Sequence, residues 1–202
     1  MVQNFVARAL LRTSLSRYSD LPPDTWQFTT TDLGKPIISS EAHVIVPRFN
    51  VSHTHGLAAC VVAARHDVGI DVENAARPVD ELVIARQFLA FRELARIAGS
   101  PPSARRSVFL RYWTLREAYL KARGTGIGAA SSDFSFDLVP GRPPRLVLEN
   151  EDDRCWQFVE LRLWGNYHLA VAIRRQSDPD LVCVTEEFVP EGTSLVGTAR
   201  EN

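Results

Sequence analysis

Cysteine is scarce in this chain, and long apolar runs are missing. The three cysteines, Cys60, Cys155 and Cys183, lie far apart and form no CxxC pair, which argues against a disulfide framework or a cysteine zinc site and favours a reducing compartment. No apolar run approaches the ~20 residues that span a bilayer. Arg8 and Arg12 interrupt the apolar pattern at the start, so a secretory signal is not indicated. We expect a cytoplasmic protein.

An excess of charge of either sign is also missing. The net charge is about −1 over 202 residues, which does not suggest a sequence-independent grip on nucleic acid. The chain is 45% hydrophobic and 23% charged, as is typical of globular proteins, and is long enough for one full domain or two small ones. We expect a monomer without nucleic-acid or membrane partners. A local basic cluster could still bind a smaller anion.

The chain is organised around one stretch, FLRYWTLREAYLKARGTGIG at residues 109–128. It predicts a helix over 109–123 that ends at a glycine-rich exit. Trp113, Glu117 and Lys121 recur every four residues, so they share one stripe of this helix. An exposed ion pair would explain the stripe. The alternative is a metal and an anion bound side by side.

A second stretch, DVGIDVE at residues 67–73, alternates apolar and polar residues with the period of a strand. One face is apolar and the other presents Asp71 and Glu73 next to each other. Two like charges on one strand face repel each other. Solvent could screen them, or a hard cation such as Mg²⁺ could neutralise them.

Candidate anion contacts lie in turns and at strand ends. A Gly-Lys-Pro turn fixes the direction of Lys35. Asn50, Ser52 and His53 are expected between two strand candidates, where they can face a ligand. His53 and His55 could share a face for zinc, but no further ligand has a persuasive spacing. A Ser/His nucleophile is weakly supported, because no glycine elbow surrounds Ser52.

The order of elements predicts an α+β fold with two similar halves, residues 1–66 and 67–202, each a helix plus an antiparallel sheet. The tail from about residue 190 is expected to be mobile. The expected helices are residues 2–18, 81–89, 91–98 and 109–123. The expected strands are residues 25–30, 57–63, 67–73, 134–138, 145–148, 156–163, 168–173 and 181–185.

The motifs FNVSH, VGIDVE and WTLREAYLK, in this order, resemble those of the 4′-phosphopantetheinyl transferases. That family carries F-N-[IV]-S-H, [VI]-G-[IV]-D-[IV]-E and W-x-x-K-E-[AS]-x-x-K followed by a glycine-containing loop. The resemblance is to the single-chain, pseudodimeric (Sfp-type) class. It extends to Gly-Lys-Pro at Lys35 and to the ALLR helix around Arg12, and covers roughly residues 5–175.

The resemblance implies that the chain transfers the phosphopantetheine arm of coenzyme A to a serine of an apo carrier protein, releasing 3′,5′-ADP. Mg²⁺ would be held by Asp71, Glu73 and Glu117, with Glu117, Lys121 and Asp71 as the catalytic residues and Glu117 as the general base. Coenzyme A would be contacted by Arg12, Lys35, Pro36, Asn50, Ser52, His53 and Lys121.

Two departures from the family pattern stand out. Arg116 replaces the lysine that usually precedes the catalytic glutamate, which keeps the charge but changes the hydrogen-bonding geometry. Family members usually carry some tens of residues before the ALLR helix, so a truncated start is one interpretation. An inactive coenzyme A or carrier-protein binding module and a metal-dependent phosphohydrolase are the alternative functions.

Overall fold

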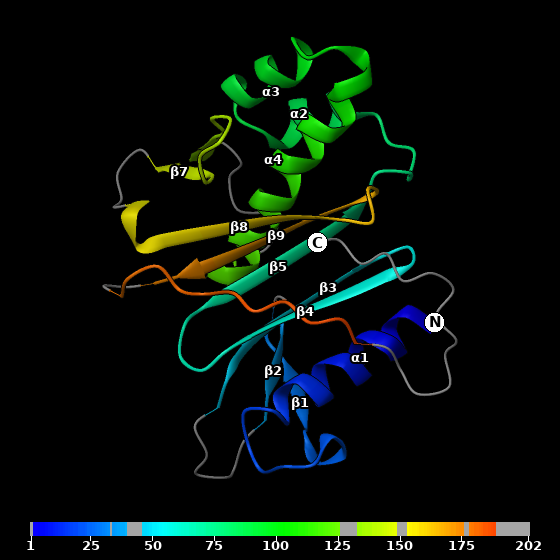
Figure 1. Ribbon diagram of the computed structural model, residues 1–202, viewed down its shortest axis with the longest axis vertical. Helices are drawn as coiled ribbons and strands as arrows, with labels where there is room; N and C mark the ends of the chain where they lie inside the picture. The colour runs from blue at the N-terminus through cyan, green and yellow to red at the C-terminus, as the bar shows by residue number, and fades with distance from the viewer. Residues whose placement is uncertain are drawn as a thin grey trace.

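The computed structural model describes residues 2–32, 34–39, 46–125, 133–148, 153–175 and 178–188 (Figure 1). Its helices are α1 (Val2–Leu15), α2 (Glu81–Phe88), α3 (Phe91–Ala98) and α4 (Pro102–Arg123), with short 3-10 turns at Pro23–Thr25 and Asp153–Cys155. Its strands are β1 (Phe28–Thr30), β2 (Pro36–Ile38), β3 (Arg48–Thr54), β4 (Leu57–Ala63), β5 (Val68–Asn74), β6 (Phe134–Asp137), β7 (Arg145–Leu148), β8 (Trp156–Leu163) and β9 (Tyr167–Arg174).

An antiparallel sheet of order β5-β9-β8 forms the centre of the molecule (Figure 1). Its β5 and β9 strands are buried on both faces, because α4 packs on one face while apolar residues of β4 pack on the other. The alanines Ala170 and Ala172 of β9 belong to the core under α4. Their small side chains let the long helix lie close to the sheet.

The helix α4 begins at Pro102, seven residues before the predicted start at Phe109. Its first two turns are polar and carry no apolar period, but proline is well suited to the first turn of a helix. The end agrees with the prediction: Gly124 adopts a left-handed φ of 72° and caps the last turn. The predicted exit glycines Gly126 and Gly128 lie outside the described residues.

The first half packs α1 against the β3–β4 hairpin around a small core of Leu11, Leu15, Trp26 and Phe49. The strand β3 lies beside β5 (Figure 1) and joins it through side chains. Asn50 Oδ1 accepts a hydrogen bond from Ile70 N at 2.9 Å, and Ser52 Oγ accepts one from Val72 N at 3.3 Å. These polar side chains accept the hydrogen bonds of backbone N–H groups on the edge of β5 that does not pair with β9.

The α+β class is confirmed, and each half places a helix on an antiparallel sheet. The boundary near residue 66 stays a prediction. Three expected elements differ: the first helix ends at Leu15, β1 is shorter than residues 25–30, and residues 181–185 form no strand. Asn50, Ser52 and His53 lie within β3 rather than in a connection.

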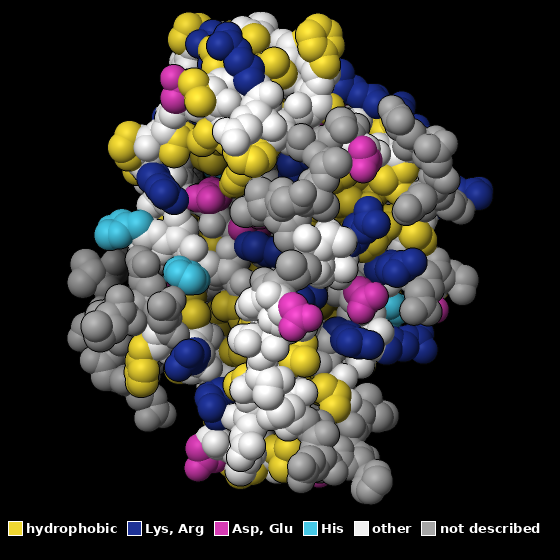
Figure 2. Space-filling model, turned by 180° about the vertical axis from the view of Figure 1, so that it is seen from behind, with side chains coloured by type: hydrophobic (Ala, Val, Ile, Leu, Met, Phe, Trp, Pro, Cys, Tyr) yellow, Lys and Arg dark blue, Asp and Glu magenta, His cyan; other side chains and the backbone are white. Residues whose placement is uncertain are grey.

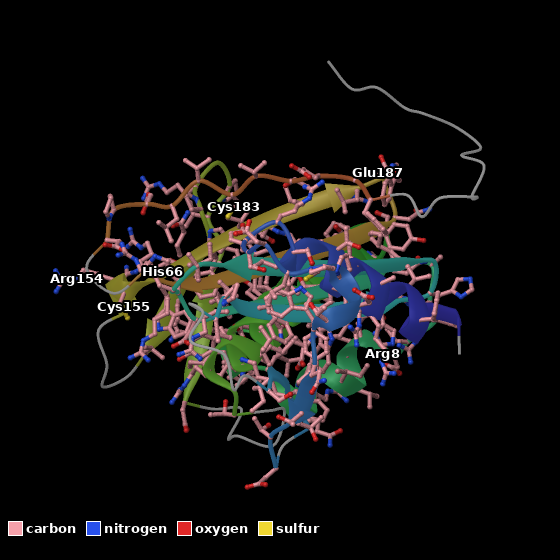
Figure 3. All side chains as sticks on the ribbon, turned by 90° about the horizontal axis from the view of Figure 1, so that it is seen from below. Arg8, His66, Arg154, Cys155, Cys183 and Glu187 are labelled. Carbon is pink, nitrogen blue, oxygen red and sulfur yellow. The ribbon has the colours of Figure 1, made fainter. Side chains whose placement is uncertain are left out.

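Residues 178–188 instead form an extended segment that leaves the end of β9 and runs back across the molecule. The side chain of Gln157 bonds both backbone groups of Leu181 at 2.8 Å, and Arg17 of the first half forms an ion pair with Glu186. Figure 3 shows Cys183 on this segment, apart from Cys155 near the start of β8. All three cysteines are free. The expected mobile tail lies beyond the described residues.

Within the described residues, no helix is long and apolar enough to cross a membrane.

Candidate active site

Gly69 of β5 determines how closely the sheet and α4 approach. A Cβ atom at this position would collide with the carbonyl oxygen of Ala118 and lie 2.5 Å from the nitrogen of Ala122. Only glycine therefore allows the helix backbone to rest on the strand. This contact brings Asp71, two residues along β5, beside the helix stripe that carries Glu117 and Lys121.

Asp71 is buried and forms an ion pair with the partly exposed Lys121, whose Nζ lies 2.6 Å from Asp71 Oδ1. Ser52 Oγ donates to the same Asp71 oxygen at 3.0 Å. The Lys121 ammonium also bonds Ser52 Oγ at 3.1 Å and the Ile70 carbonyl oxygen at 3.2 Å. The three motifs of the sequence therefore meet in one hydrogen-bonded group that draws on β3, β5 and α4.

Glu117 lies one helical turn before Lys121 and is only 6% exposed. Desolvation by burial is the main cause that raises the pKa of its carboxyl to about 7. The charges of Asp71 and Glu73 act in the same direction, whereas those of Lys121 and Arg116 lower the pKa. Its Oε1 atom has no hydrogen-bond partner among the described residues. A buried acid with a pKa near neutral can exchange a proton at physiological pH.

Glu73 is the third predicted carboxylate and is half-buried at the end of β5. Desolvation raises its pKa, and the charge of Asp71 raises it further. A hydrogen bond with Trp113 and the charge of Lys121 both lower it. Trp113 also packs between Phe88 and Phe109, with ring centroids 5.8 and 5.9 Å away. Trp113 thus contacts a site carboxylate as well as the core.

The arrangement of the three carboxylates bears on a possible metal site. In the part of the chain that the structure describes, no group of three acidic, histidine or cysteine side chains is arranged to hold an ion. Asp71 Oδ2 and Glu117 Oε1 are nevertheless buried and lack partners among the described residues. Mg²⁺ is commonly held by one or two carboxylates together with phosphate oxygens and water. The residues therefore fit a divalent cation, with Asp71 and Glu117 as the readiest ligands.

Lys35 reaches the same place from the other half of the chain. Its Nζ donates to the carbonyl oxygen of Lys121 at 2.8 Å, near the end of α4. Burial lowers its pKa by desolvation, while Asp67 raises it and Arg48 lowers it. Pro36 follows at the start of β2. The structure thus brings Lys35 and Lys121 together, as an anion site requires.

The remaining predicted contacts lie elsewhere or have structural partners. Arg12 donates to the carbonyl oxygens of Pro23 and Asp24 at 2.9 and 3.2 Å and lies over the Phe28 ring. Asn50 is buried against β5, as described above, whereas His53 is exposed on β3.

On the face shown in Figure 2, acidic and basic side chains lie close together at mid-height, below the helices.

Arg116 points away from this site, which the sequence did not indicate. It is 2% exposed and forms an ion pair at 3.0 Å with Glu93, a fully buried residue of α3. It also donates to the carbonyl oxygen of Phe134 at 3.1 Å and lies 4.1 Å from the centre of that ring. The departure from the family lysine therefore concerns packing between α4, α3 and β6.

Two of the missed residues had weak signals in the sequence. Gly69 is a lone glycine inside a strand pattern, which often marks a close backbone approach. Glu93 accepts from the backbone nitrogen of Ala90 at 2.9 Å, as a capping residue of α3 does, and from Phe136 N at 2.7 Å. Its second role, as the partner of Arg116, had no local signal.

Comparisons with known proteins agree with the motifs. A family model described as the 4′-phosphopantetheinyl transferase superfamily matches residues 67–172. The 4′-phosphopantetheinyl transferase HetI of Nostoc sp. is 34% identical over 167 residues, which cover 82% of this chain and 68% of HetI. The L-aminoadipate-semialdehyde dehydrogenase-phosphopantetheinyl transferase of Rattus norvegicus is 26% identical over 184 residues, which cover 83% of this chain and 60% of the rat protein.

Among solved structures, a holo-[acyl-carrier-protein] synthase of Thermotoga maritima is similar with a TM-score of 0.43 and 25% identity. The match covers 54% of this chain and 63% of that chain.

The fold and the site first define a class: an α+β protein in which a helix and a sheet edge place carboxylates beside lysines. The family match and the similarity to HetI then settle the family. The chain belongs to the 4′-phosphopantetheinyl transferase superfamily. The predicted family, fold class and enzyme class are confirmed. The roles of individual residues stay predictions.

Proposed function

We propose that this protein transfers the 4′-phosphopantetheine group of coenzyme A to a serine hydroxyl of an apo acyl, peptidyl or aryl carrier protein, in a Mg²⁺-dependent reaction. The observation that carries the proposal is Glu117: a buried carboxyl with a pKa of about 7 beside the Asp71–Lys121 pair. This supplies a base and a cation at one place, within the region that matches the family.

Glu117 is the general base of the proposed reaction. It removes the proton of the carrier serine hydroxyl, directly or through one water, as the serine oxygen attacks the β-phosphorus of coenzyme A. A new bond forms between the serine oxygen and this phosphorus, and the pyrophosphate P–O bond breaks. The electron pair leaves with 3′,5′-ADP. A pKa near the working pH makes a carboxylate effective in this role.

Lys121 and Lys35 hold the negative charge of the substrate. Lys121 lies between β5 and α4, where Asp71 and Ser52 fix the direction of its ammonium group. Lys35 is bonded to the carbonyl oxygen of Lys121, so both cations approach one anion from neighbouring positions. Because phosphoryl transfer depends on positioning and electrostatic stabilisation, fixed cations of this kind suffice without a covalent intermediate.

The two carboxylates with unpaired oxygens, Asp71 and Glu117, would hold Mg²⁺ together with the pyrophosphate, and Glu73 would be the third ligand. When bound, the cation neutralises charge on the phosphate oxygens. The first half of the chain would contact coenzyme A through Arg12, Pro36, Asn50, Ser52 and His53. A cytoplasmic monomer remains the expected state.

The proposal is tested by incubating the protein with coenzyme A, Mg²⁺ and a panel of apo carrier proteins from fatty-acid, polyketide and peptide synthesis. Mass spectrometry should show at least one carrier gaining one phosphopantetheine group, and chromatography should show 3′,5′-ADP in equal amount. EDTA should abolish both products. Coenzyme A binding without transfer to any carrier would contradict the proposal and favour a binding module. Product formation from coenzyme A without a carrier would instead favour a phosphohydrolase.

A further inference from the structure

Glu73 of β5 lies between β3 and β9. On each of these neighbouring strands, a buried polar side chain near Glu73 lacks a hydrogen-bond partner among the described residues. On β3, Ser52 pairs with Asp71, nineteen residues further along the chain. The neighbouring contact from Asn74 Nδ2 to the His55 carbonyl oxygen keeps the same offset, so β3 and β5 advance in parallel along this stretch. Thr54 therefore stands beside Glu73 as Ser52 stands beside Asp71.

Thr54 differs from Ser52 in one respect. The Ser52 hydroxyl donates to Asp71 and accepts from Val72 N and Lys121. The Thr54 side chain is equally buried, at 6% exposure, yet its Oγ1 has no hydrogen-bond partner among the described residues. A buried hydroxyl without a partner is unfavourable unless a ligand or a moving side chain completes it.

His168 lies on β9, on the side of Glu73 opposite to Thr54. It is directly across from Glu73 in the β5–β9 register, and residues so paired in an antiparallel ladder have Cβ atoms about 4.5–5.5 Å apart on the same face. His168 is 5% exposed, and its Nε2 has no hydrogen-bond partner among the described residues. Desolvation and then the charge of Arg162 lower the pKa of His168 to about 4. Its Nε2 atom can carry a proton and donate a hydrogen bond.

Beyond His168 is a hollow of about 210 Å³ between α4 and β8. The side chains of Arg111 and Glu160 along this hollow pair with each other through two hydrogen bonds, at 2.9 and 2.7 Å. The Glu160 carboxylate is thus turned toward Arg111. Glu73 lies directly across from His168 in the β5–β9 register, on the same face of the sheet, so its carboxylate is a suitable acceptor for Nε2.

We propose that Thr54 and His168 are positioning residues that hold the Glu73 carboxylate in its metal-binding orientation, Thr54 through its hydroxyl and His168 through Nε2–H. The inference rests on the proposed function, because it takes the cation as the reason for Glu73 to turn toward Asp71 and Glu117. Among the described residues, the three carboxylates do not converge on one ion position. An ionised carboxylate has about four acceptor sites, enough for two flanking donors and a cation.

The test compares variants that remove each donor with variants that keep it. Thr54→Val and His168→Leu remove the hydrogen-bond donor at similar volume, whereas Thr54→Ser and His168→Gln retain a donor. Ser135→Ala is the matched control, because Ser135 Oγ is another buried hydroxyl without a partner among the described residues, on β6. The probe is Mn²⁺, titrated into the full chain with coenzyme A and without a carrier, and free Mn²⁺ is measured by electron paramagnetic resonance.

Thr54→Val and His168→Leu should each raise the Kd for Mn²⁺ about tenfold, the lower end of the usual effect of losing an outer partner of a metal ligand. Thr54→Ser and His168→Gln should restore binding to near the wild-type value, and Ser135→Ala should leave it unchanged. In a Glu73→Gln background, Thr54→Val should add little, because the carboxylate that it positions is gone.

Wild-type Mn²⁺ affinity in Thr54→Val or in His168→Leu overturns the proposal for the pair. So does a loss that Thr54→Ser or His168→Gln fails to restore, or one that persists in full in the Glu73→Gln background. A wild-type chain that binds Mn²⁺ but transfers nothing contradicts the proposed function alone, since the Mn²⁺ comparison still decides the roles of Thr54 and His168. A wild-type chain that binds no Mn²⁺ overturns the metal assignment and this inference with it.

Discussion

The helix α4 carries two ion pairs that differ in burial and in hydrogen bonding. Arg116 and Glu93 are both almost fully buried, and Glu93 accepts hydrogen bonds from Arg116, Ala90 N and Phe136 N. Lys121 and Asp71 are also paired, but Asp71 keeps one buried oxygen without a partner among the described residues, and Lys121 is partly exposed. Both oxygens of the Glu93 carboxylate are engaged in the first pair. In the second pair, one oxygen of the Asp71 carboxylate is left open to a ligand.

Because of this difference, we expect the two ion pairs to respond differently to substitution. Removing one partner of a buried pair leaves an uncompensated charge, which costs far more than the pair contributes. In the Asp71–Lys121 pair, one carboxylate oxygen already lacks a partner among the described residues. Removing a partner there should therefore lower stability less and weaken ligand binding instead. We therefore expect substitutions at Arg116–Glu93 to change stability, and substitutions around Asp71–Lys121 to change activity.

The largest effect is expected for Glu117→Gln. The variant keeps the size of the side chain but removes the base and one ligand charge, so the rate of transfer should fall about 10²–10⁴-fold. The free energy of unfolding should not fall, because the ionised carboxylate is disfavoured in the folded state. Transfer rates from mass spectrometry and urea unfolding measure the two quantities. Near-wild-type turnover would exclude Glu117 as the base.

Glu93→Ala should act in the opposite way. It leaves the Arg116 guanidinium buried without its carboxylate, which should lower the free energy of unfolding by about 3–5 kcal/mol. Adding Arg116→Met should recover part of that loss by removing the stranded charge. Urea unfolding of the single and double variants checks this. A Glu93→Ala variant as stable as wild type would show that the Arg116–Glu93 pair does not stabilise the fold more than the Asp71–Lys121 pair does.

Gly69→Ala should affect the Asp71–Lys121 pair and spare the other. The added methyl group collides with the α4 backbone at Ala118, so the helix must move away from β5. Overpacking of this kind costs about 1–3 kcal/mol, and the altered spacing should also lower the transfer rate. Gly141→Ala is a suitable control, because Gly141 has open space around it. Wild-type stability and activity in Gly69→Ala would contradict the close packing.

The stability of the folded protein should also depend on pH. Burial raises the pKa of Glu117 from 4.5 to about 7, so the folded state binds this proton more tightly than the unfolded chain. The contribution to stability is full below pH 4.5 and is lost as the pH rises through about 7. Urea midpoints of the metal-free protein in EDTA should show this decline, and Glu117→Gln should reduce it. An unchanged slope in the variant would place the decline elsewhere.

Much of the site was predictable because it follows local periods. Asp71 and Glu73 alternate along a strand, and Glu117 and Lys121 recur along a helix, so the sequence indicates which side chains share a face. The structure adds that Ser52 bridges the two elements. That bridge depends on β3 lying beside β5, which no local pattern specifies.

The parts that could not be predicted depend on contacts between distant segments. Arg116 and Glu93 pair across 23 residues, and nothing near either residue identifies the other. Residues 181–185 have the composition of a strand, but they meet the sheet through the side chain of Gln157 rather than through a backbone ladder. Arg12 bonds the carbonyl oxygens of Pro23 and Asp24, a contact that no local pattern indicates, and its predicted contact with coenzyme A stays a prediction.

The side-chain bridge from β3 to β5 has a consequence for solubility. An unpaired strand edge is a template on which other chains can add as strands and aggregate. Asn50 and Ser52 occupy the outward N–H groups of Ile70 and Val72, so another chain cannot pair there without displacing them. The same polar side chains that border the Asp71–Lys121 pair therefore keep the central sheet from growing beyond β5.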